Sequence, residues 1–331
     1  MPVNIAILGL GRVGASLGKA LLAHEDLRVT GYDSEPETSK ALQRLKGLHK
    51  AEWNLLNAVG GADLVVISAP LAEQRGILKA ILPELRAGGV VLALSGLLLK
   101  PLAWAAELFP AGADKHFVAG HAVLNPAHLH SGEVGLEAAD ASLFKDGLWA
   151  LAPAPGCAAE ALKLVADLVR VVEATPYFVD PNEHDGLAAA TEALPTLLAW
   201  MLFQTAAASP GWSETRKVAD RSFATATVAL AEAEFDSLRY NRTNVLRYLD
   251  TLLAELQTVR QWLAQDSDEG RLLEATLKEM GQHRAEWLQQ RRRGEWEAFE
   301  SAPPEMPRAG EMVGRMFVGG LLNRRDKGAR K

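Results

Sequence analysis

The chain has few of the residues that several classes of protein need. Its 331 residues include one cysteine, Cys157, so it can form neither an intramolecular disulfide nor a CxxC zinc or redox motif. Positive charge is not in excess, because the formal net charge is −6, which argues against nucleic acid or an anionic membrane as a general partner. The start, MPVNIAILGLG, lacks the features of an export signal. We therefore expect a cytoplasmic protein with a small-molecule partner.

One apolar stretch resembles a membrane span. It runs from Gly186 to Ala208, 23 residues in which Glu192 is the only charge, and its length alone would permit a transmembrane helix. Pro195 and Gln204 in its interior, together with its many alanines, favour a helix in the centre of a helical core or a dimer. We therefore expect no membrane contact.

The first half of the chain alternates short β-branched runs with helical stretches. Helices are expected near Glu73 to Leu85 and from Ala158 to Val172, among others. The strand candidates are NIAILGL, LRVTGYD, ADLVVISAP, GGVVLALS, HFVAGH, DGLWALAP and TPYFVD. This alternation predicts an α/β fold with a parallel sheet and helices on both faces.

After Asn182 the β-branched runs vanish and apolar residues recur at helical spacing. Steps of three, four and seven residues predict one long amphipathic helix from Glu232 to Leu263, and a second is expected to begin near Ser267. We therefore divide the chain into an α/β domain, an all-helical domain and a basic, poorly ordered tail. Their expected ranges are 1–180, 181–297 and 298–331.

Three glycines follow the first strand, in the order G-L-G-R-V-G, at the mouth of a helix. Gly9 permits a tight turn, Gly11 lets a pyrophosphate approach the backbone, and Gly14 lets the helix pack against the strand. The helix N-terminus faces the phosphate charge. The residues assigned to this cofactor loop are Gly9, Leu10, Gly11, Arg12, Val13 and Gly14.

The ends of the next two strands extend the cofactor site. The second strand ends in GYD, which places Asp33 19 residues after Gly14. There its carboxylate can accept hydrogen bonds from both ribose hydroxyls and would repel the 2′-phosphate of NADP. The third strand ends in SAP, and Ser68, Ala69 and Pro70 are expected beneath the nicotinamide ribose. The pattern predicts a Rossmann-type domain that binds NAD.

Four of the eight histidines lie in KHFVAGHAVLNPAHLH, at positions 116, 121, 128 and 130. A zinc site would need an acid or cysteine partner at metal-binding spacing, which this stretch lacks, so we expect no metal. Only His121 stands at a strand end beside a glycine, where a parallel sheet presents its ligand-binding edge. A neutral imidazole there can accept a proton near neutral pH. We interpret His116, His128 and His130 as bystanders.

The order of several motifs is similar to that in the prephenate and arogenate dehydrogenases of tyrosine biosynthesis. The motifs span roughly residues 4–260 and are GLGRVGASLGKAL, GADLVVISAP, FVAGH, GLEAADASLF, NEHDGLAAA, LPTLLA, TRKVA and NRTNVLRYLD. The resemblance implies a Rossmann domain followed by an all-helical domain that forms a homodimer.

The resemblance also implies a reaction, the NAD-dependent oxidative decarboxylation of a cyclohexadienol. Hydride leaves the ring carbon that bears the hydroxyl, and loss of CO2 makes the ring aromatic. By the same resemblance, His121 takes the hydroxyl proton and Arg216 of TRKVA grips a substrate carboxylate through two hydrogen bonds. Arg216 could otherwise form a surface or interdomain salt bridge.

The chain departs from the family pattern at three places. AVLNPA follows His121, where PMAGSE or a similar sequence is common. LSGLLLK replaces a D-x-G-S-x-K turn, so Ser95 either supports the histidine or substrate hydroxyl or is only a turn residue. EALPT replaces SHLPH and puts Glu192 and Ala193 where a serine and a histidine are expected. If Glu192 lines the pocket, we expect it to favour the amino group of arogenate over the keto group of prephenate.

Other interpretations remain open from the sequence. The chain could be a diverged dehydrogenase for another small carboxylate, or an imine or 3-hydroxyacid reductase with Lys217 as the helical-domain donor. It could also be a non-catalytic NAD-binding protein. His184 and Asp185, at the start of the helical domain, match a family HD pair, in which Asp185 either orients His184 or caps this helix near its N-terminus and contacts the other domain.

Overall fold

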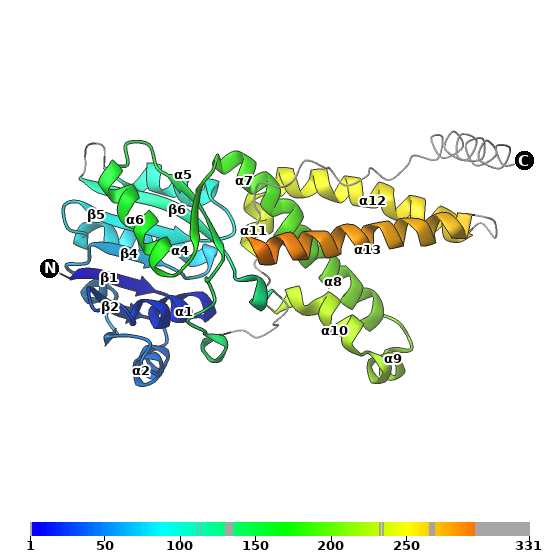
Figure 1. The fold of residues 1–331 in the computed structure, drawn as a ribbon, viewed down its shortest axis with the longest axis horizontal. Helices are drawn as coiled ribbons and strands as arrows, with labels where there is room; N and C mark the ends of the chain where they lie inside the picture. Colours follow the sequence, from blue (N-terminus) through cyan, green and yellow to red (C-terminus); the bar gives the residue numbers. More distant parts are fainter. Residues whose placement is uncertain are drawn as a thin grey trace, which may run out of the picture. The chain divides into compact units, whose positions relative to one another are not determined.

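The computed structural model describes residues 2–110, 112, 114–129, 135–231, 233, 235–264 and 269–294. An eight-stranded sheet has the order β3-β2-β1-β4-β5-β6-β7-β8 (Figure 1). Neighbouring strands from β3 to β6 run parallel. The strands are β1 (Val3–Leu8), β2 (Leu27–Tyr32), β3 (Lys50–Glu52), β4 (Leu64–Ile67), β5 (Gly89–Leu94), β6 (Lys115–Val123), β7 (Leu148–Pro153) and β8 (Thr175–Phe178).

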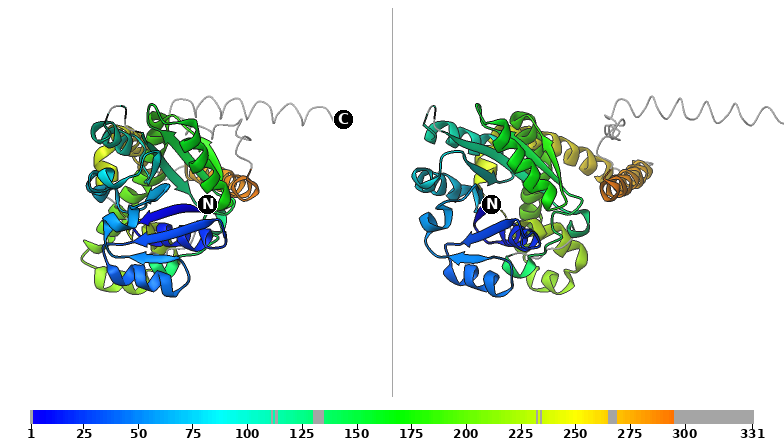
Figure 2. Two further views of the ribbon diagram at one scale, coloured as in Figure 1. Left: turned by 90° about the vertical axis from the view of Figure 1, so that its left-hand side faces the viewer. Right: turned by 60° about the vertical axis from the view of Figure 1, so that its left-hand side comes forward.

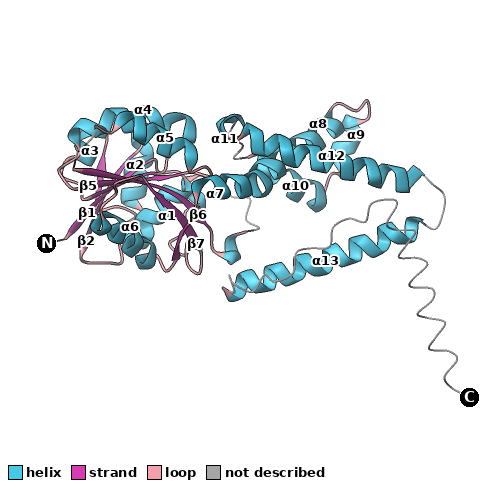
Figure 3. Cartoon of the chain, turned by 90° about the horizontal axis from the view of Figure 1, so that it is seen from above, coloured by secondary structure: helices cyan, strands magenta, loops and turns pink. Residues whose placement is uncertain are grey.

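Helices cover both faces of the sheet (Figure 2, Figure 3). The strands read as continuous apolar runs because alternate side chains enter two separate cores, with Ile5 and Ile7 of β1 in one and Ala6 and Leu8 in the other. This confirms the predicted α/β architecture. The helices of this region are α1 (Arg12–Leu21), α2 (Pro36–Arg44), α3 (Leu55–Val59), α4 (Leu71–Ile81), α5 (Leu99–Leu108) and α6 (Ala159–Val171).

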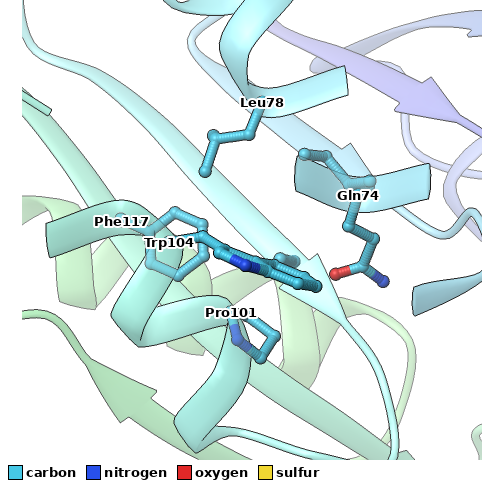
Figure 4. Close-up of a pocket in the computed structure, with 7 residues that line it drawn as sticks. Gln74, Leu78, Pro101, Trp104 and Phe117 are labelled. Atoms are coloured by element: carbon cyan, nitrogen blue, oxygen red, sulfur yellow. The ribbon is translucent and has the colours of Figure 1, made fainter. Parts of the chain in front are cut away.

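The packing of α4 and α5 on the sheet fixes the carboxyl ends of two central strands. Figure 4 shows Leu78 and Gln74 of α4 facing Trp104 of α5, with Phe117 of β6 behind. The buried amide of Gln74 donates to the carbonyl of Ala69 at 3.0 Å and to that of Leu94 at 2.7 Å. These two carbonyls lie just after β4 and at the end of β5, so Gln74 ties the two strand ends together.

The strand β7 is an exception to the expected parallel arrangement. This strand runs antiparallel to β6, with His121 opposite Ala150, and β8 runs parallel to β7. The described part of the β6–β7 connection contains two short 3-10 turns, Pro126–His128 and Leu136–Ala138, in place of a crossover helix. Without a crossover the chain is not carried back across the sheet, so β7 starts beside the end of β6.

After β8 every described element is a helix. α7 (Pro181–Ala188) leads through a π-helical turn (Ala189–Ala193) into α8 (Leu194–Ala207). By length and composition Pro181–Ala207 is the one described helical segment that could cross a membrane, and 22% of its most apolar window is buried. The elements that follow in the first unit defined below are α9 (Trp212–Val218), α10 (Arg221–Thr227) and α11 (Phe235–Tyr240).

The long helix expected from Glu232 to Leu263 is two helices, α11 and α12 (Arg242–Ala264). They are separated at Asn241, whose buried side-chain amide donates to the carbonyl of Asp185 at 2.6 Å. This tertiary hydrogen bond holds Asn241 in a turn between the two helices. Because Asn241 lies within the predicted apolar stripe, the periodicity alone cannot reveal the break.

The chain divides into two compact units, Met1–Tyr248 and Leu249–Lys331. The second contains the remainder of α12 and α13 (Glu269–Arg293). The domain boundary expected near residue 180 stays a prediction, although the last strand does end at Phe178. Ser267 and the basic tail, residues 298–331, lie outside the described residues.

Candidate active site

The glycine-rich loop has the geometry that a dinucleotide phosphate needs. Gly9 has φ of +90°, and a Cβ there would lie 2.7 Å from the Ala69 nitrogen. A Cβ on Gly14 would lie 2.0 Å from the Gly9 carbonyl oxygen, so this glycine permits the close contact between α1 and β1. A Cβ on Gly11 would meet nothing within 4 Å. The open space over Gly11, at the N-terminus of α1, can accept a phosphate group.

Asp33 lies beside this loop at the end of β2. Its Oδ2 accepts the Leu10 N–H at 2.7 Å and its Oδ1 accepts the Glu35 N–H at 3.0 Å. The carboxylate therefore fixes the loop backbone, and its remaining lone pairs can still accept from ribose hydroxyls. Arg12 and Val13 begin α1, whose first turn contains no acidic residue that would repel a phosphate.

The SAP segment follows β4 at the same edge of the sheet. The Ser68 N–H donates to the Leu8 carbonyl at 2.7 Å, which joins the end of β4 to the start of the glycine loop. Ala69 is buried and Pro70 is the N-cap of α4. Ser68 and Ala69 therefore lie directly against Leu8 and Gly9 at the start of the glycine-rich loop.

His121 lies near the carboxyl end of β6, and both of its ring nitrogens contact another side chain. Nε2 lies 2.8 Å from Oε1 of Glu192, and Nδ1 lies 3.0 Å from Nε2 of His184. The two imidazole rings are T-shaped, with centroids 5.2 Å apart. The site therefore combines β6 with α7 and the π-helical turn that follows it.

A carboxylate anchors the far end of this chain of side chains. Nδ1 of His184 lies 3.2 Å from Oδ1 of Asp185, and both residues are buried. Asp185 also accepts the N–H of Leu98 at 2.8 Å and that of Leu99 at 3.2 Å, so it caps α5. The N-cap of its own helix is Asp180. Asp185 is thus placed to orient His184, but the expectation that it caps its own helix is wrong, because it caps the distant helix α5 instead.

The electrostatics of the cluster favour a charged pair. Burial acts to lower the pKa of His121, but the charge and hydrogen bond of Glu192 and the charge of Asp185 outweigh it and raise the pKa above its usual value. Burial acts to raise the pKa of Glu192, but the charge and hydrogen bond of His121 act against it, and the pKa is lowered. Both shifts favour the charged forms of the two side chains.

The approach of Glu192 to His121 depends on two local features. The π-helical turn Ala189–Ala193 adds a residue to one helical turn and directs Glu192 toward the sheet, as such turns often do at functional sites. Gly96 follows β5, and a Cβ on it would lie 2.1 Å from Oε2 of Glu192. The LSG sequence therefore provides the space that the glutamate occupies.

Ser95 has a local partner. Its hydroxyl donates to the carbonyl of Leu97, and its N–H donates to the carbonyl of Gly120 at 2.9 Å. These bonds fit the turn interpretation, while a catalytic role for Ser95 stays a prediction.

Arg216 is not brought to His121 within one chain. It is exposed on α9, which is joined to the far end of α8 by a ring contact of 5.7 Å between Phe203 and Trp212. Figures 1 and 3 both show α9 away from α7 and β6. Phe203 is 11 residues beyond Glu192, roughly 16 Å along a helix axis. A substrate-binding role for Arg216 stays a prediction.

The other described histidines of this stretch have partners outside the cluster. His116 Nε2 lies 3.7 Å from Oδ1 of Asp114, and His128 Nε2 lies 3.2 Å from the hydroxyl of Ser142. His130 lies outside the described residues. The AVLNPA departure forms a capped turn, in which Asn125 accepts the Ala127 N–H at 2.9 Å.

Sequence reasoning did not foresee the contact of His184 with His121 or the space above Gly96. The HD pair gave a signal for His184, but nothing in the spacing of 63 residues between the two histidines predicts that they meet. Gly96 carries no signal by itself, because its role is defined by a side chain 96 residues later in the chain.

Two protein-family models match the chain. One, described as "Prephenate dehydrogenase, nucleotide-binding domain", matches residues 17–177. The other, described as "Prephenate dehydrogenase, dimerization domain", matches residues 180–279. Together they cover well over half of the 331 residues.

The chain is also similar to individual dehydrogenases. A cyclohexadienyl dehydrogenase of Zymomonas mobilis is 26% identical over 274 residues, which are 80% of this chain and 90% of the relative. The prephenate dehydrogenase of Bacillus subtilis is 24% identical over 279 residues, 81% and 72% of the two chains. The solved prephenate dehydrogenase of A. aeolicus, in complex with hydroxyphenyl propionate and NAD+, is 21% identical with a TM-score of 0.73 over 86% and 98% of the chains. This last likeness concerns the fold.

Proposed function

Because the chain belongs to the prephenate dehydrogenase family, we propose that it catalyses the NAD-dependent oxidative decarboxylation of prephenate or arogenate as a cytoplasmic homodimer. The observation that carries the proposal is the position of His121. It is a histidine held at both ring nitrogens, at the edge of the sheet where β1 and its glycine-rich loop also end. In an open α/β sheet, ligands bind at this edge.

His121 would act as the base. The hydroxyl O–H bond of the substrate breaks, a bond forms from that proton to Nε2, and a carbonyl forms as hydride leaves the same ring carbon. NAD, when bound, supplies the hydride acceptor. Loss of CO2 then makes the ring aromatic. His184 and Asp185 hold Nδ1, which fixes the ring orientation and leaves Nε2 as the reacting nitrogen.

The residues of the loop fit NAD. Gly9 and Gly14 stand where a Cβ would clash with backbone, and the space over Gly11 is open to a pyrophosphate. Asp33 at the end of β2 favours a free ribose 2′-hydroxyl over a phosphate, which supports NAD rather than NADP. Arg12 begins α1, where its charge can assist phosphate binding.

The contact between Glu192 and His121 bears on substrate choice. Oε1 of Glu192 lies 2.8 Å from the nitrogen that would accept the hydroxyl proton. The hydroxyl and the amino-bearing side chain of arogenate stand at opposite ends of its ring. Glu192 in this position is therefore at the hydroxyl end, which does not support the idea that it recognises the amino group.

A homodimer is supported by the exposed apolar surface of α8. Five large apolar residues of this strongly apolar helix are 40–51% exposed. The residues are Leu198, Trp200, Met201, Leu202 and Phe203. Burial of such a surface against a second copy is favourable. A second copy would also offer a route for Arg216 to reach a His121 site from another chain.

The test is a spectrophotometric assay of NADH formation with prephenate and arogenate in parallel. We expect turnover with at least one substrate, and the ratio of the two kcat/KM values defines the preference. NAD binding without turnover of either substrate would contradict the proposed reaction and favour a non-catalytic or differently directed NAD-binding protein.

A further inference from the structure

We propose that Glu192 is a positioning residue that acts through His121. In the free protein its carboxylate holds the ring as an imidazolium and occupies the place that the substrate hydroxyl must take, so His121 can act as a base only after Glu192 withdraws. The proposal rests on the proposed function for the role of His121 as the base, but the ion pair itself can be tested without turnover.

The first support is the occupation of both ring nitrogens. Nε2 faces Glu192 at 2.8 Å and Nδ1 faces His184 at 3.0 Å. A substrate hydroxyl that donates to the ring needs one nitrogen with a free lone pair. Nδ1 lies on the buried side against His184, whereas the Glu192 side chain is 40% exposed. The hydroxyl must therefore replace the carboxylate at Nε2.

The second support is the count of protons along the chain of contacts. Asp185 accepts two backbone N–H groups of α5 and is an acceptor toward His184, so Nδ1 of His184 carries a proton. When His184 carries only this proton, its Nε2 is an acceptor, and Nδ1 of His121 donates to it. Glu192 accepts at the opposite nitrogen. In this arrangement His121 satisfies both neighbours with a proton on each of its nitrogens.

The third support is the environment of the ring. The titratable groups that face His121 are Glu192, His184 and Asp185, all from α7 and the π-helical turn. The turn after β5 contributes Ser95 and Gly96, and β7 contributes Ala150. None of these three residues has a side chain that gains or loses a proton near neutral pH. The two carboxylates outweigh burial and raise the pKa of His121.

The consequence is a proton that must leave before catalysis. The imidazolium loses its Nε2 proton to solvent, Glu192 moves away, and only then can Nε2 accept the hydroxyl proton. No electrons are transferred in this step. The Glu192 side chain is flexible and 40% exposed, so its carboxylate can move toward solvent.

The experiment follows the His121 ring by NMR in isotopically labelled protein without substrate, with its signal assigned from His121→Gln. Glu192→Gln keeps the shape of the side chain and removes its charge. Glu183→Gln makes the same charge change at an exposed position of α7 and is the matched control. Gly96→Ala is a second route, because the added Cβ would displace the carboxylate without removing it. Thermal unfolding of each variant verifies that it folds.

We expect the midpoint of His121 to fall by about one unit or more in Glu192→Gln, since an opposite charge at this distance shifts a pKa by roughly 1–3 units. Gly96→Ala should lower it in the same direction, and Glu183→Gln should leave it unchanged. Equal midpoints in the parent chain and Glu192→Gln would overturn the proposal, whatever the enzyme assay shows.

Kinetics provide an independent readout if the chain turns over its substrate. The acid limb of kcat/KM reports the free enzyme, so it should move to lower pH in Glu192→Gln by the same amount as the NMR midpoint. One unit below the parent midpoint, the variant should retain about a fivefold larger fraction of its own plateau for a shift of one unit. An unmoved acid limb beside a shifted NMR midpoint would show that the free base is not rate-determining and would overturn the catalytic part of the proposal.

Discussion

The glycine-rich loop and the His121 cluster lie at the same edge of one sheet but are assembled differently. The loop uses consecutive residues and backbone geometry, and Asp33, at the end of the adjacent strand, fixes its backbone. The cluster combines side chains from β6, the turn after β5, α7 and the π-helical turn. The loop is therefore a property of a local sequence, whereas the cluster is a property of the fold.

This difference predicts different responses to substitution. In the loop, a methyl group added to a glycine meets either fixed backbone or open space. The effect of each substitution therefore depends on the surroundings of that one position. In the cluster each side chain sets the protonation or orientation of the next, so a change at one residue is detected at another. The following predictions test that contrast, starting from the largest expected effect.

Replacement of His121 should have the largest effect. His121→Gln keeps a polar side chain but removes the base, and we expect kcat to fall by about 10²- to 10⁴-fold. The affinity for NAD, measured by fluorescence titration, should stay within about twofold, because the loop is built independently of the cluster. His116→Gln, at the other end of β6, is the control. A kcat reduced equally by both substitutions would mean that the strand, and not the base, is being perturbed.

Arg216 is expected to act on substrate binding. Arg216→Ala should raise KM by roughly 10- to 100-fold through the loss of a charge-assisted bond to a carboxylate. Lys217→Ala, which removes a neighbouring cation paired with Glu214 at 2.8 Å, is the matched control. An unchanged KM in Arg216→Ala would remove this residue from the site.

Co-expression of the His121→Gln and Arg216→Ala chains then shows whether His121 and Arg216 of one active site come from the same chain or from the two subunits of a dimer. If Arg216 serves the site of the other subunit, random mixing gives about one quarter of the sites a working pair of residues. If both residues serve the same chain, no mixed dimer contains an intact site. Activity of the mixed sample above that of each separate variant decides between the two arrangements.

The glycine loop should separate stability from cofactor affinity. Gly14→Ala forces a Cβ to 2.0 Å from a backbone oxygen and should destabilise the fold by about 1–3 kcal/mol. Gly11→Ala has open space and should leave the melting temperature unchanged, while the Kd for NAD rises roughly tenfold because the methyl group occupies the phosphate approach. Gly76→Ala on α4, also with open space, controls for the methyl group itself. Equal NAD affinity in Gly11→Ala and Gly76→Ala would contradict the assignment.

The smallest expected effect is the contribution of the His121–Glu192 pair to the free energy of unfolding, which depends on pH. The pKa of Glu192 is lowered, so its contribution is present above its unfolded value near ~4.3 and is lost as the pH falls. The pKa of His121 is raised, so its contribution is present below its unfolded value near ~6.5 and is lost as the pH rises through the folded value. The pair should therefore stabilise most between about pH 4.5 and 6.5.

In that window Glu192→Gln should lower the melting temperature by roughly 1–3 °C, because a partly exposed pair contributes at most about 1 kcal/mol. The difference should shrink as the pH rises through the folded-state pKa of His121, which lies above its unfolded value. Differential scanning calorimetry at several pH values measures it, with Glu183→Gln alongside. A difference that is constant across pH would point to packing rather than to the ion pair.

Much of the α/β fold was predictable because its signals are local. The strands β1, β2, β4, β5 and β6 follow from apolar runs, and α6 lies within one residue of its expected bounds at each end. The short strand β3, Lys50–Glu52, was not predicted, because only three residues with two charged side chains form it. The direction of β7 was not predictable in this way, because it depends on the path of a connection without a crossover helix. The break at Asn241 was missed for a similar reason, since its cause is a bond to the distant Asp185.

By itself, the sequence determined the nucleotide loop, the alternation of strands and helices, and His121 as the histidine at a strand end. These depend on residues close together in the chain, where spacing fixes geometry. Only the tertiary structure brought Glu192, His184 and Gly96 to His121 and left Arg216 on a helix beyond α8. Such meetings depend on how helices pack against a sheet, and the protonation of His121 depends on those meetings because charge acts through space and not along the chain.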